Sequence, residues 1–178
     1  MIAFGCVADR ALIMIGTPAD ARDFAIEAHG QQRYGDAPYD AHLAAVVQIL
    51  SEFGYGGAYE AAGWLHDVVE DTGIVIDQVR DRFGDEVADL VDAVTGLGAN
   101  RAERNARIYA GLQRCPAAAV VKLADRIANV EAAMPGSDHH RRYRREAPSF
   151  ALIVEPNVPS TMWQRLLSAL QTLDHGAG

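Results

Sequence analysis

The sequence predicts an all-α fold in which several helices form one bundle. Apolar residues recur at three- and four-residue spacing in many segments, as in Leu90, Val91 and Val94. No stretch alternates apolar and polar residues over enough positions to build a sheet. The chain has 178 residues, which fits one compact domain with a full hydrophobic core. Because it contains neither an internal repeat nor a linker, we expect a single domain over residues 1–178.

Signals for helix starts and stops set the order of the elements. Thr17 is followed by a proline at the first helical position and by Asp20 in the first turn, which is typical of a capped helix start. Gly84 separates two helices, and glycine or proline residues end most of the others. In chain order, the expected helices cover approximately residues 18–32, 40–53, 58–73, 77–83, 85–97, 101–113, 116–134 and 160–173.

Some segments give a weaker or different prediction. Residues 1–17 carry no clear signal and are expected to form a lead-in. Residues 34–38 have the composition of a turn. Residues 101–113 are polar and predict either a helix or a partly ordered segment, and residues 138–147 are strongly basic. We expect residues 138–178 to form the C-terminal helices.

Composition and charge exclude several classes of protein. The net charge of −8 at pH 7 would repel nucleic acid and an anionic membrane at long range, so neither is an expected partner. Cys6 and Cys115 have no metal-binding spacing and suggest no disulfide framework. Asp9 and Arg10 interrupt the apolar start, and no segment has the roughly 20 apolar residues of a membrane span. We expect a soluble cytoplasmic protein; the composition does not predict its oligomeric state.

The stretch from residue 61 to residue 73 combines an apolar start with an abrupt change to polar residues, and we read it as one helix. His66 and Asp67 are adjacent, so their side chains diverge and can grip one ion from two directions. Glu70 and Asp71 follow Asp67 by three and four residues, which places the three carboxylates on one side of a helix. Carboxylates at such short distances repel one another unless a cation lies among them. A solvated acidic helix end is the alternative, but the apolar context favours half of a metal site.

The other half of this site is expected from two further helices. His42 lies near the start of one helix, and Asp125 lies on the apolar face of another. Two imidazoles and two carboxylates suit Mn²⁺, Fe²⁺, Zn²⁺ or Co²⁺ and leave coordination positions for water and substrate, as in a catalytic site. The predicted metal ligands are His42, His66, Asp67 and Asp125.

Two of these ligands have alternative readings when each is taken alone. Asp125 could form an ion pair with Lys122 or Arg126, which neighbour it on the same helix. His42 could be a buried or capping histidine with no metal. The metal hypothesis is favoured because all the ligand candidates occur together in one chain.

Three motifs in this order resemble the signature of HD-domain phosphohydrolases. They are YDAH at residues 39–42, LHDVVEDT at 65–72 and VKLADRIAN at 121–129. More narrowly, they are similar to the hydrolase domain of RelA/SpoT-type proteins and to the free-standing small alarmone hydrolases. AHGQQRYGDAPY at residues 28–39 matches the opening segment of that family, and the resemblance covers about residues 19–133.

The resemblance implies a single HD-domain helical bundle with a metal site in its core. It also implies a Mn²⁺-dependent enzyme that removes pyrophosphate from guanosine tetra- or pentaphosphate (ppGpp or pppGpp), leaving GDP or GTP. The chain has no room for the synthetase domain of the long family members, so hydrolysis without synthesis is expected. Glu70 would orient or deprotonate the attacking water, and Asp71 would hold that water or Glu70, or shuttle the proton.

Four residues are candidates for substrate binding. Arg33 resembles the family arginine that stacks on the guanine base, although a solvated loop residue is an equal alternative. Asn129, four residues after Asp125, can hydrogen-bond the sugar or a phosphate. Tyr34 could stack on the base or the ribose. Arg104 and the basic run at 139–145 could bind terminal phosphates, the alternative being solvated helix faces.

Several positions depart from the alarmone-hydrolase pattern: Tyr34, Leu43, Ala128 and Glu131. Two of these departures remove positive charge close to a highly anionic substrate. They motivate a second hypothesis, an HD phosphohydrolase that acts on NADPH, another nucleotide or a small phosphate ester. A third hypothesis is a nucleotide-binding module without turnover, which the intact acidic residues argue against.

Overall fold

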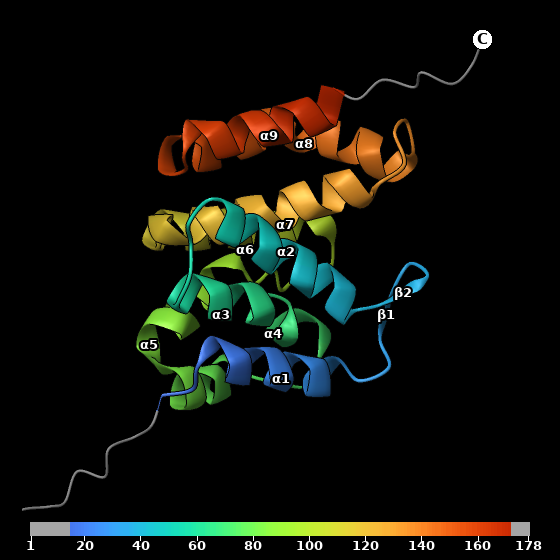
Figure 1. Cartoon of the computed structure of the whole chain (residues 1–178). Coiled ribbons are helices and arrows are strands. Elements are labelled where there is room, and N and C mark those ends of the chain that lie inside the picture. The colour runs from blue at the N-terminus through green and yellow to red at the C-terminus, as the bar shows by residue number, and fades with distance from the viewer. Residues whose placement is uncertain (1–14, 172–178) are drawn as a thin grey trace, which may run out of the picture.

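The computed structural model describes residues 15–171 and is built almost entirely from helices (Figure 1). In chain order the helices are α1 Pro18–His29, α2 Asp40–Glu52, α3 Ala58–Leu65, α4 Val68–Asp71, α5 Ile76–Val94, α6 Arg101–Arg114, α7 Ala119–Ala132, α8 Asp138–Val154 and α9 Ser160–Gln171. Short 3₁₀ turns, Pro116–Ala118 and Glu155–Asn157, precede α7 and follow α8. The predicted all-α fold is confirmed. Most of the expected lead-in, residues 1–17, lies outside the described residues. The expected end of the last helix, at Leu173, also lies outside them.

The helices stack in layers around α7. Figure 1 shows α1 at one end of the stack, α2 and α7 in the middle, and α8 with α9 at the other end. α7 packs against α2 on one side and against α9 on the other. Its apolar face is buried, and Leu123 and Ile127 have no exposed surface. Because each large apolar side chain contributes about 1.5–3 kcal/mol when buried, α7 is the element that holds the layers together.

Caps explain where several helices begin. Thr17 Oγ1 accepts a hydrogen bond from the Asp20 N–H at 3.2 Å, as the sequence predicts, and the Thr17 N–H donates to Asp20 Oδ2 at 2.8 Å. Asn100 caps α6 through the Glu103 N–H at 3.0 Å, so the polar segment that follows is a regular helix. Ser137 caps α8 in the same way, and the predicted basic segment lies in this helix.

Two glycines shape α5 and its neighbour. Gly84 has φ +84° and ψ 172°, which breaks α5 into two helical parts, as the sequence predicts. Gly111 lies in α6 against the backbone of Ala93, so closely that a Cβ at this position would be 2.3 Å from the Ala93 carbonyl oxygen. α5 and α6 can therefore pack together only because residue 111 has no side chain.

The stretch from residue 61 to residue 73 is not the single helix that the sequence predicts. α3 ends at Leu65 and α4 begins at Val68, with His66 and Asp67 between them. In a continuous helix the Gly63 carbonyl would accept from the Asp67 N–H. Here the Gly63 carbonyl accepts from Nδ1 of His66 at 2.9 Å. The His66 side chain thus competes with the helical backbone, and the helix breaks at the doublet.

A small hairpin follows α1 where the sequence predicts a turn and no sheet. Its strands, β1 Arg33–Tyr34 and β2 Ala37–Pro38, pair in antiparallel register, with Tyr34 opposite Ala37. Gly35 occupies the turn with φ +58°. The prediction of no sheet is wrong for this segment, because two residues per strand are too few to show an alternating pattern.

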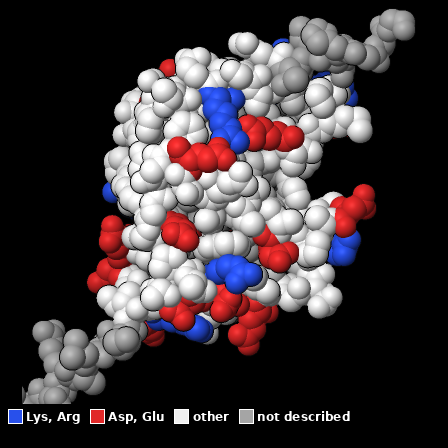
Figure 2. Space-filling view, in the orientation of Figure 1, with Lys and Arg blue, Asp and Glu red and all other residues white. Residues whose placement is uncertain are grey.

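The surface carries mixed charge. Figure 2 shows acidic and basic side chains side by side on the face in view, with broad uncharged areas between them. Cys115 is a free cysteine. Across residues 15–171, none of the helices combines the length and the apolar character that crossing a membrane requires.

Candidate metal centre

The four predicted metal ligands meet at one point, although they come from three separate parts of the chain. His42 comes from the first turn of α2, His66 and Asp67 from the connection between α3 and α4, and Asp125 from α7. Nε2 of His42 lies 3.7 Å from Asp67 Oδ2 and 3.5 Å from Asp125 Oδ1. Nε2 of His66 lies 3.0 Å from Asp67 Oδ2 and 3.8 Å from Asp125 Oδ1. Two ring nitrogens and two carboxylate oxygens therefore surround one small volume.

The orientation of His66 fits a bound cation. Its Nδ1 donates to the Gly63 carbonyl, which can only accept, so Nε2 carries the lone pair in the neutral ring. Nε2 is buried and makes no hydrogen bond to any described residue, although an oxygen of Asp67 is near. Ligand atoms of His42, His66 and Asp67 all lie within 4.8 Å of one another. These residues could hold one divalent metal ion.

Burial and neighbouring charges act in opposite directions on the pKa values of these residues. Burial alone would lower the pKa of His66, but the Asp67 and Asp125 carboxylates raise it to about 9. Burial alone would raise the pKa of Asp67, but the adjacent His66 lowers it to about 2. The pKa of Asp125 lies well below its ordinary value, because Lys122 and both histidines outweigh burial. Both carboxylates therefore stay ionised and favour a cation between them.

Asp125 faces two ways. Its Oδ1 points towards the histidines, and its Oδ2 accepts from Nζ of Lys122 at 2.8 Å. The ion pair with Lys122 that the sequence offered as an alternative thus exists alongside the cluster. Arg126 pairs with Glu146 instead, at 3.1 Å.

Tyr39 supports the doublet from the other side, a contact that the sequence did not reveal. Its hydroxyl donates to Asp67 Oδ2 at 2.5 Å, and burial together with Asp67 raises the pKa of Tyr39. Tyr39 precedes His42 by three residues at the start of α2, but this spacing does not indicate a contact with Asp67. This second contact fixes Asp67 before any ligand binds.

Glu70 and Asp71 follow the doublet on α4 but face different surroundings. Glu70 Oε1 accepts from the Gly96 N–H, and burial raises the pKa of Glu70. Asp71 is exposed and accepts from Nε2 of Gln32 at 2.9 Å, and the Gln32 side-chain oxygen in turn contacts Nδ1 of His29 at 2.9 Å. The structure therefore places Glu70 beside the cluster and ties Asp71 to the end of α1.

A pocket of about 290 Å³ opens next to the ligand cluster, between α6, α7 and α8. The pocket is lined by Glu70 and Asp125 and by five cationic side chains: Arg101, Arg104, Lys122, Arg126 and Arg142. Arg104, a predicted substrate residue, is therefore in the pocket. From the basic run at 139–145, Arg142 and Tyr143 line it, whereas Arg141 pairs with Asp138 at 2.7 Å. The pocket has the charge that binds phosphate groups.

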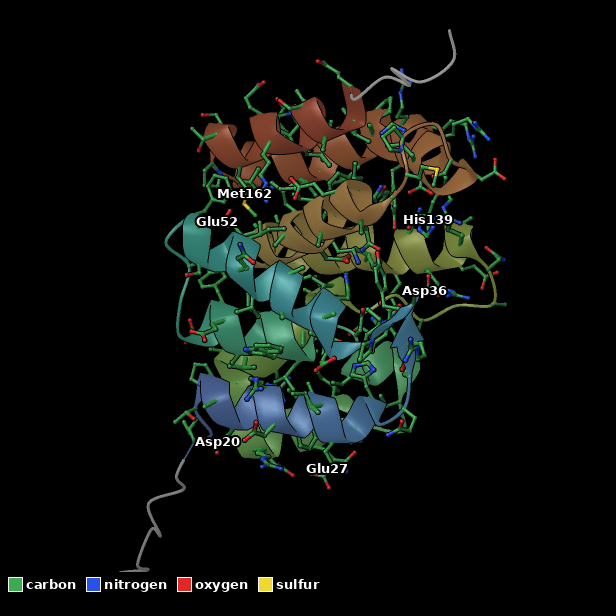
Figure 3. The ribbon with its side chains drawn as sticks, turned by 45° about the vertical axis from the view of Figure 1, so that its right-hand side comes forward. Asp20, Glu27, Asp36, Glu52, His139 and Met162 are labelled. Carbon is green, nitrogen blue, oxygen red and sulfur yellow. The ribbon has the colours of Figure 1, made fainter. Side chains whose placement is uncertain are left out.

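The hairpin also borders the cluster. The Tyr34 ring stacks on the ring of His42, with centroids 4.6 Å apart, and its hydroxyl donates to Asn129 Oδ1 at 2.9 Å. Arg33 is exposed and donates to the Asp36 carbonyl. Figure 3 shows Asp36 and His139 on the same side of the molecule, away from Glu52 and Met162. Tyr34 and Asn129 are brought together at the cluster, but Arg33 does not line the cationic pocket.

The HD domain family model matches residues 21–149. The chain belongs to the HD domain family. The matched residues include all four candidate ligands of this HD domain, so the family match and the geometry concern the same part of the chain.

Relatives of this HD domain are named as enzymes that act on guanosine phosphates. The guanosine-3′,5′-bis(diphosphate) 3′-pyrophosphohydrolase MESH1 of Xenopus tropicalis is 36% identical over 129 residues, which are 68% of this chain and 69% of that protein. A GTP pyrophosphokinase of Streptomyces coelicolor is 41% identical over 107 residues, 57% of this chain but 13% of that protein. This HD domain therefore spans a small part of its long relatives.

A solved structure has the same fold over nearly its whole length. It is that of a metazoan ortholog of SpoT that hydrolyses ppGpp, and it superposes with a TM-score of 0.69 at 25% sequence identity. The superposition covers 86% of this chain and 93% of the other. The HD-domain bundle expected from the motifs is thus confirmed.

Proposed function

We propose that this chain hydrolyses guanosine 3′,5′-bis(diphosphate) and the corresponding pentaphosphate, releasing pyrophosphate and leaving GDP or GTP. One observation carries the proposal: the predicted ligands His42, His66, Asp67 and Asp125 meet beside a pocket lined by five cationic side chains. Such a pocket suits the clustered negative charge of a diphosphate group. The named activities of the shorter relative and of the solved metazoan structure support the same reaction.

The proposal includes one divalent metal ion held by these four side chains. Mn²⁺ is our choice, with Fe²⁺, Zn²⁺ or Co²⁺ as alternatives, because two imidazoles and two carboxylates form a mixed nitrogen and oxygen ligand set. When bound, such an ion lowers the pKa of water and withdraws charge from a phosphoryl oxygen. The buried Nε2 of His66, which faces the Asp67 carboxylate at 3.0 Å, supports this assignment.

Glu70 is proposed as the group that orients or deprotonates water. It lines the pocket, Gly96 holds one of its oxygens, and burial raises its pKa, which favours uptake of a proton. Asp71 is proposed to pass that proton outward, since its exposed carboxylate already lies in a hydrogen-bonded chain with Gln32. The reaction adds one water across the bond between the ribose 3′-oxygen and its phosphorus.

The substrate is proposed to span both sides of the cluster. Arg104 and the other pocket cations would bind the diphosphate, and Asn129 would contact the sugar or a phosphate. Arg33 would stack on the guanine from the hairpin, where its exposure leaves room for a base. Tyr34 forms the wall between the hairpin and His42.

The proposal extends to the setting of the reaction. Residues 1–178 would act as one hydrolase domain on a small nucleotide in the cytoplasm. The two cysteines, which suggest no disulfide framework, support a reducing compartment. The net charge of −8 argues against nucleic acid or an anionic membrane as a partner.

Incubation of the Mn²⁺-loaded protein with guanosine tetraphosphate tests the proposal. We expect stoichiometric pyrophosphate and GDP, separated by anion-exchange chromatography, with no product after treatment with a chelator. Release of single phosphates, or no product across the four candidate metals, would contradict it.

Tyr34 and Arg33 favour one second candidate, a phosphohydrolase for a different nucleotide. Tyr34 supplies no charge where the family commonly has a basic residue, and Arg33 lies outside the cationic pocket. NADPH and other phosphate esters therefore belong in the substrate panel. Faster turnover of one of these than of guanosine tetraphosphate would replace the first assignment.

A further inference from the structure

Tyr34 is the residue of the hairpin that reaches into the ligand cluster. Its ring lies 4.6 Å from the His42 ring at an interplanar angle of 16°, which is a stacked contact. Its edge meets Tyr39, whose ring is 6.2 Å away at 81°. The side chain is half-buried, and burial raises its pKa to about 12, so its hydroxyl remains a donor at neutral pH. Tyr34 thus covers the outer face of one candidate metal ligand.

The hydroxyl of Tyr34 also acts on a second ligand through Asn129. Asn129 Oδ1 accepts from this hydroxyl at 2.9 Å, and its Nδ2 donates both to Asp125 Oδ1 and, at 3.0 Å, to the Asp125 carbonyl. In the opposite amide orientation, the Asn129 oxygen would face the Asp125 carboxylate. Both groups only accept hydrogen bonds, so no bond could form between them. The Asp125 oxygens therefore set the orientation of Asn129, and the Tyr34 hydroxyl anchors the amide in that orientation by donating to its oxygen.

We propose that Tyr34 is a positioning residue, which holds His42 by stacking and Asp125 through Asn129 in the arrangement that binds the metal. This inference rests on the metal role given to the cluster under the proposed function. Through these contacts Tyr34 links the start of α2 to the end of α7. Its hydrogen-bond partner Asn129 lies 95 residues away in the sequence. Groups that orient metal ligands in this way usually change metal affinity by 10- to 100-fold when removed.

A substrate-contact role predicts a different result. If Tyr34 only touched the base or the ribose, its loss would raise KM and leave metal binding unchanged. If Tyr34 positions ligands, its loss weakens metal binding in the absence of any nucleotide. Saturating metal should then restore much of kcat with little change in KM.

The test measures Co²⁺ binding to the full chain by competition with a chelator, and the visible absorption spectrum of the bound Co²⁺. Tyr34→Leu removes both contacts and should weaken binding 10- to 100-fold and change the spectrum. Tyr34→Phe keeps the stacked ring but loses the hydroxyl, and should weaken binding by about two- to tenfold, the range for one neutral hydrogen bond. Tyr55→Leu is the matched control, because Tyr55 precedes α3 and packs on Tyr59 of that helix. The Co²⁺ affinity of this variant should match that of the wild type.

Circular dichroism establishes that each variant is folded. Co²⁺ affinity of Tyr34→Leu within twofold of the wild type overturns the proposal. If Tyr34→Leu does not fold, the Co²⁺ affinity of Tyr34→Phe is the deciding measurement. An affinity of Tyr34→Phe equal to that of the wild type then overturns the proposal. Since no nucleotide is present, this outcome is independent of whether guanosine tetraphosphate is the substrate. A protein that binds Co²⁺ as described but leaves guanosine tetraphosphate intact would refute the proposed function alone.

Discussion

Glu146 joins α8 to the two helices that form the cationic pocket, and its replacement by glutamine is a sharp test of the packing there. Its carboxylate accepts from Arg101 at 2.5 and 2.8 Å and from Arg126 Nη1 at 3.1 Å. The Arg126 side chain is only 7% exposed and also lies 4.3 Å from the Phe150 ring. Glu146→Gln keeps the shape but removes the only negative partner that the described structure shows for this buried cation.

The expected loss follows from how buried each contact is. A hydrogen bond to a charged group contributes about 1.5–3 kcal/mol, whereas the exposed pair with Arg101 contributes about 1 kcal/mol or less. Glutamine still accepts one hydrogen bond, and the aromatic contacts of Arg126 remain. We expect a loss of about 1.5–3 kcal/mol, which lowers Tm by about 3–12 °C in a chain of this size.

The pH dependence of this effect has a definite sign. Burial alone would raise the pKa of Glu146, but hydrogen bonds and charge from Arg101 and Arg126 lower it below its ordinary value of 4.5. A group with a depressed folded pKa contributes stability that is fully present above the unfolded pKa and is lost as pH falls through the folded one. The difference between wild type and Glu146→Gln should therefore be constant from pH 8 to 5 and shrink below about pH 4.5.

Urea unfolding at several pH values measures this difference. Glu131→Gln is the matched control, because Glu131 is a more exposed glutamate that also pairs with an arginine, Arg165, at 2.7 Å. Arg165 keeps its other partner, Glu52, so the control should lose no more than about 1 kcal/mol. Equal losses in the two variants, or a Glu146 effect that changes between pH 8 and 5, would refute the reasoning.

Four further predictions concern the site and its frame. Asp67→Ala should abolish metal content, read by elemental analysis, together with activity; metal retained at wild-type level would remove Asp67 from the ligand set. Glu70→Gln should keep the metal but lose most turnover in steady-state assays, and near-wild-type rates would contradict its role. Arg104→Ala should raise KM several-fold with metal affinity unchanged, because Arg104 lines the pocket but does not touch the ligands. Gly111→Ala should lower the free energy of unfolding by about 1–3 kcal/mol or more, since its Cβ would meet the Ala93 carbonyl; an unchanged urea midpoint would contradict this.

Local chemistry made most helix boundaries predictable from the sequence. The Thr17 cap and the Gly84 break act over a few residues, and both are where the sequence places them. The break after Leu65 was missed, because nothing in a helical pattern shows that His66 will take the Gly63 carbonyl. The hairpin was missed because Tyr34 and Ala37 form one of only two residue pairs, too short for a periodic signal.

The candidate site, too, has features that the sequence predicts and features that it does not. The meeting of the four candidate ligands was predictable because metal binding needs particular residue types, and these occur in recognisable motifs. The contacts that orient the ligands were not, because they join residues distant in sequence. Tyr39 meets Asp67 across 28 positions, and Tyr34 meets Asn129 across 95. No spacing rule connects such pairs before the helices have packed.

Two anchors hold the doublet in the site. His66 and Asp67 both keep right-handed helical dihedrals, so their side chains diverge and reach the cluster from different directions. Nδ1 of His66 is anchored to the Gly63 carbonyl, and Asp67 is anchored to the Tyr39 hydroxyl. The Gly63 anchor is local, whereas the Tyr39 anchor exists only after the start of α2 has packed beside the doublet. Because packing brings buried carboxylates and histidines together, folding and metal binding should be linked, and a divalent ion should raise Tm as its concentration exceeds Kd.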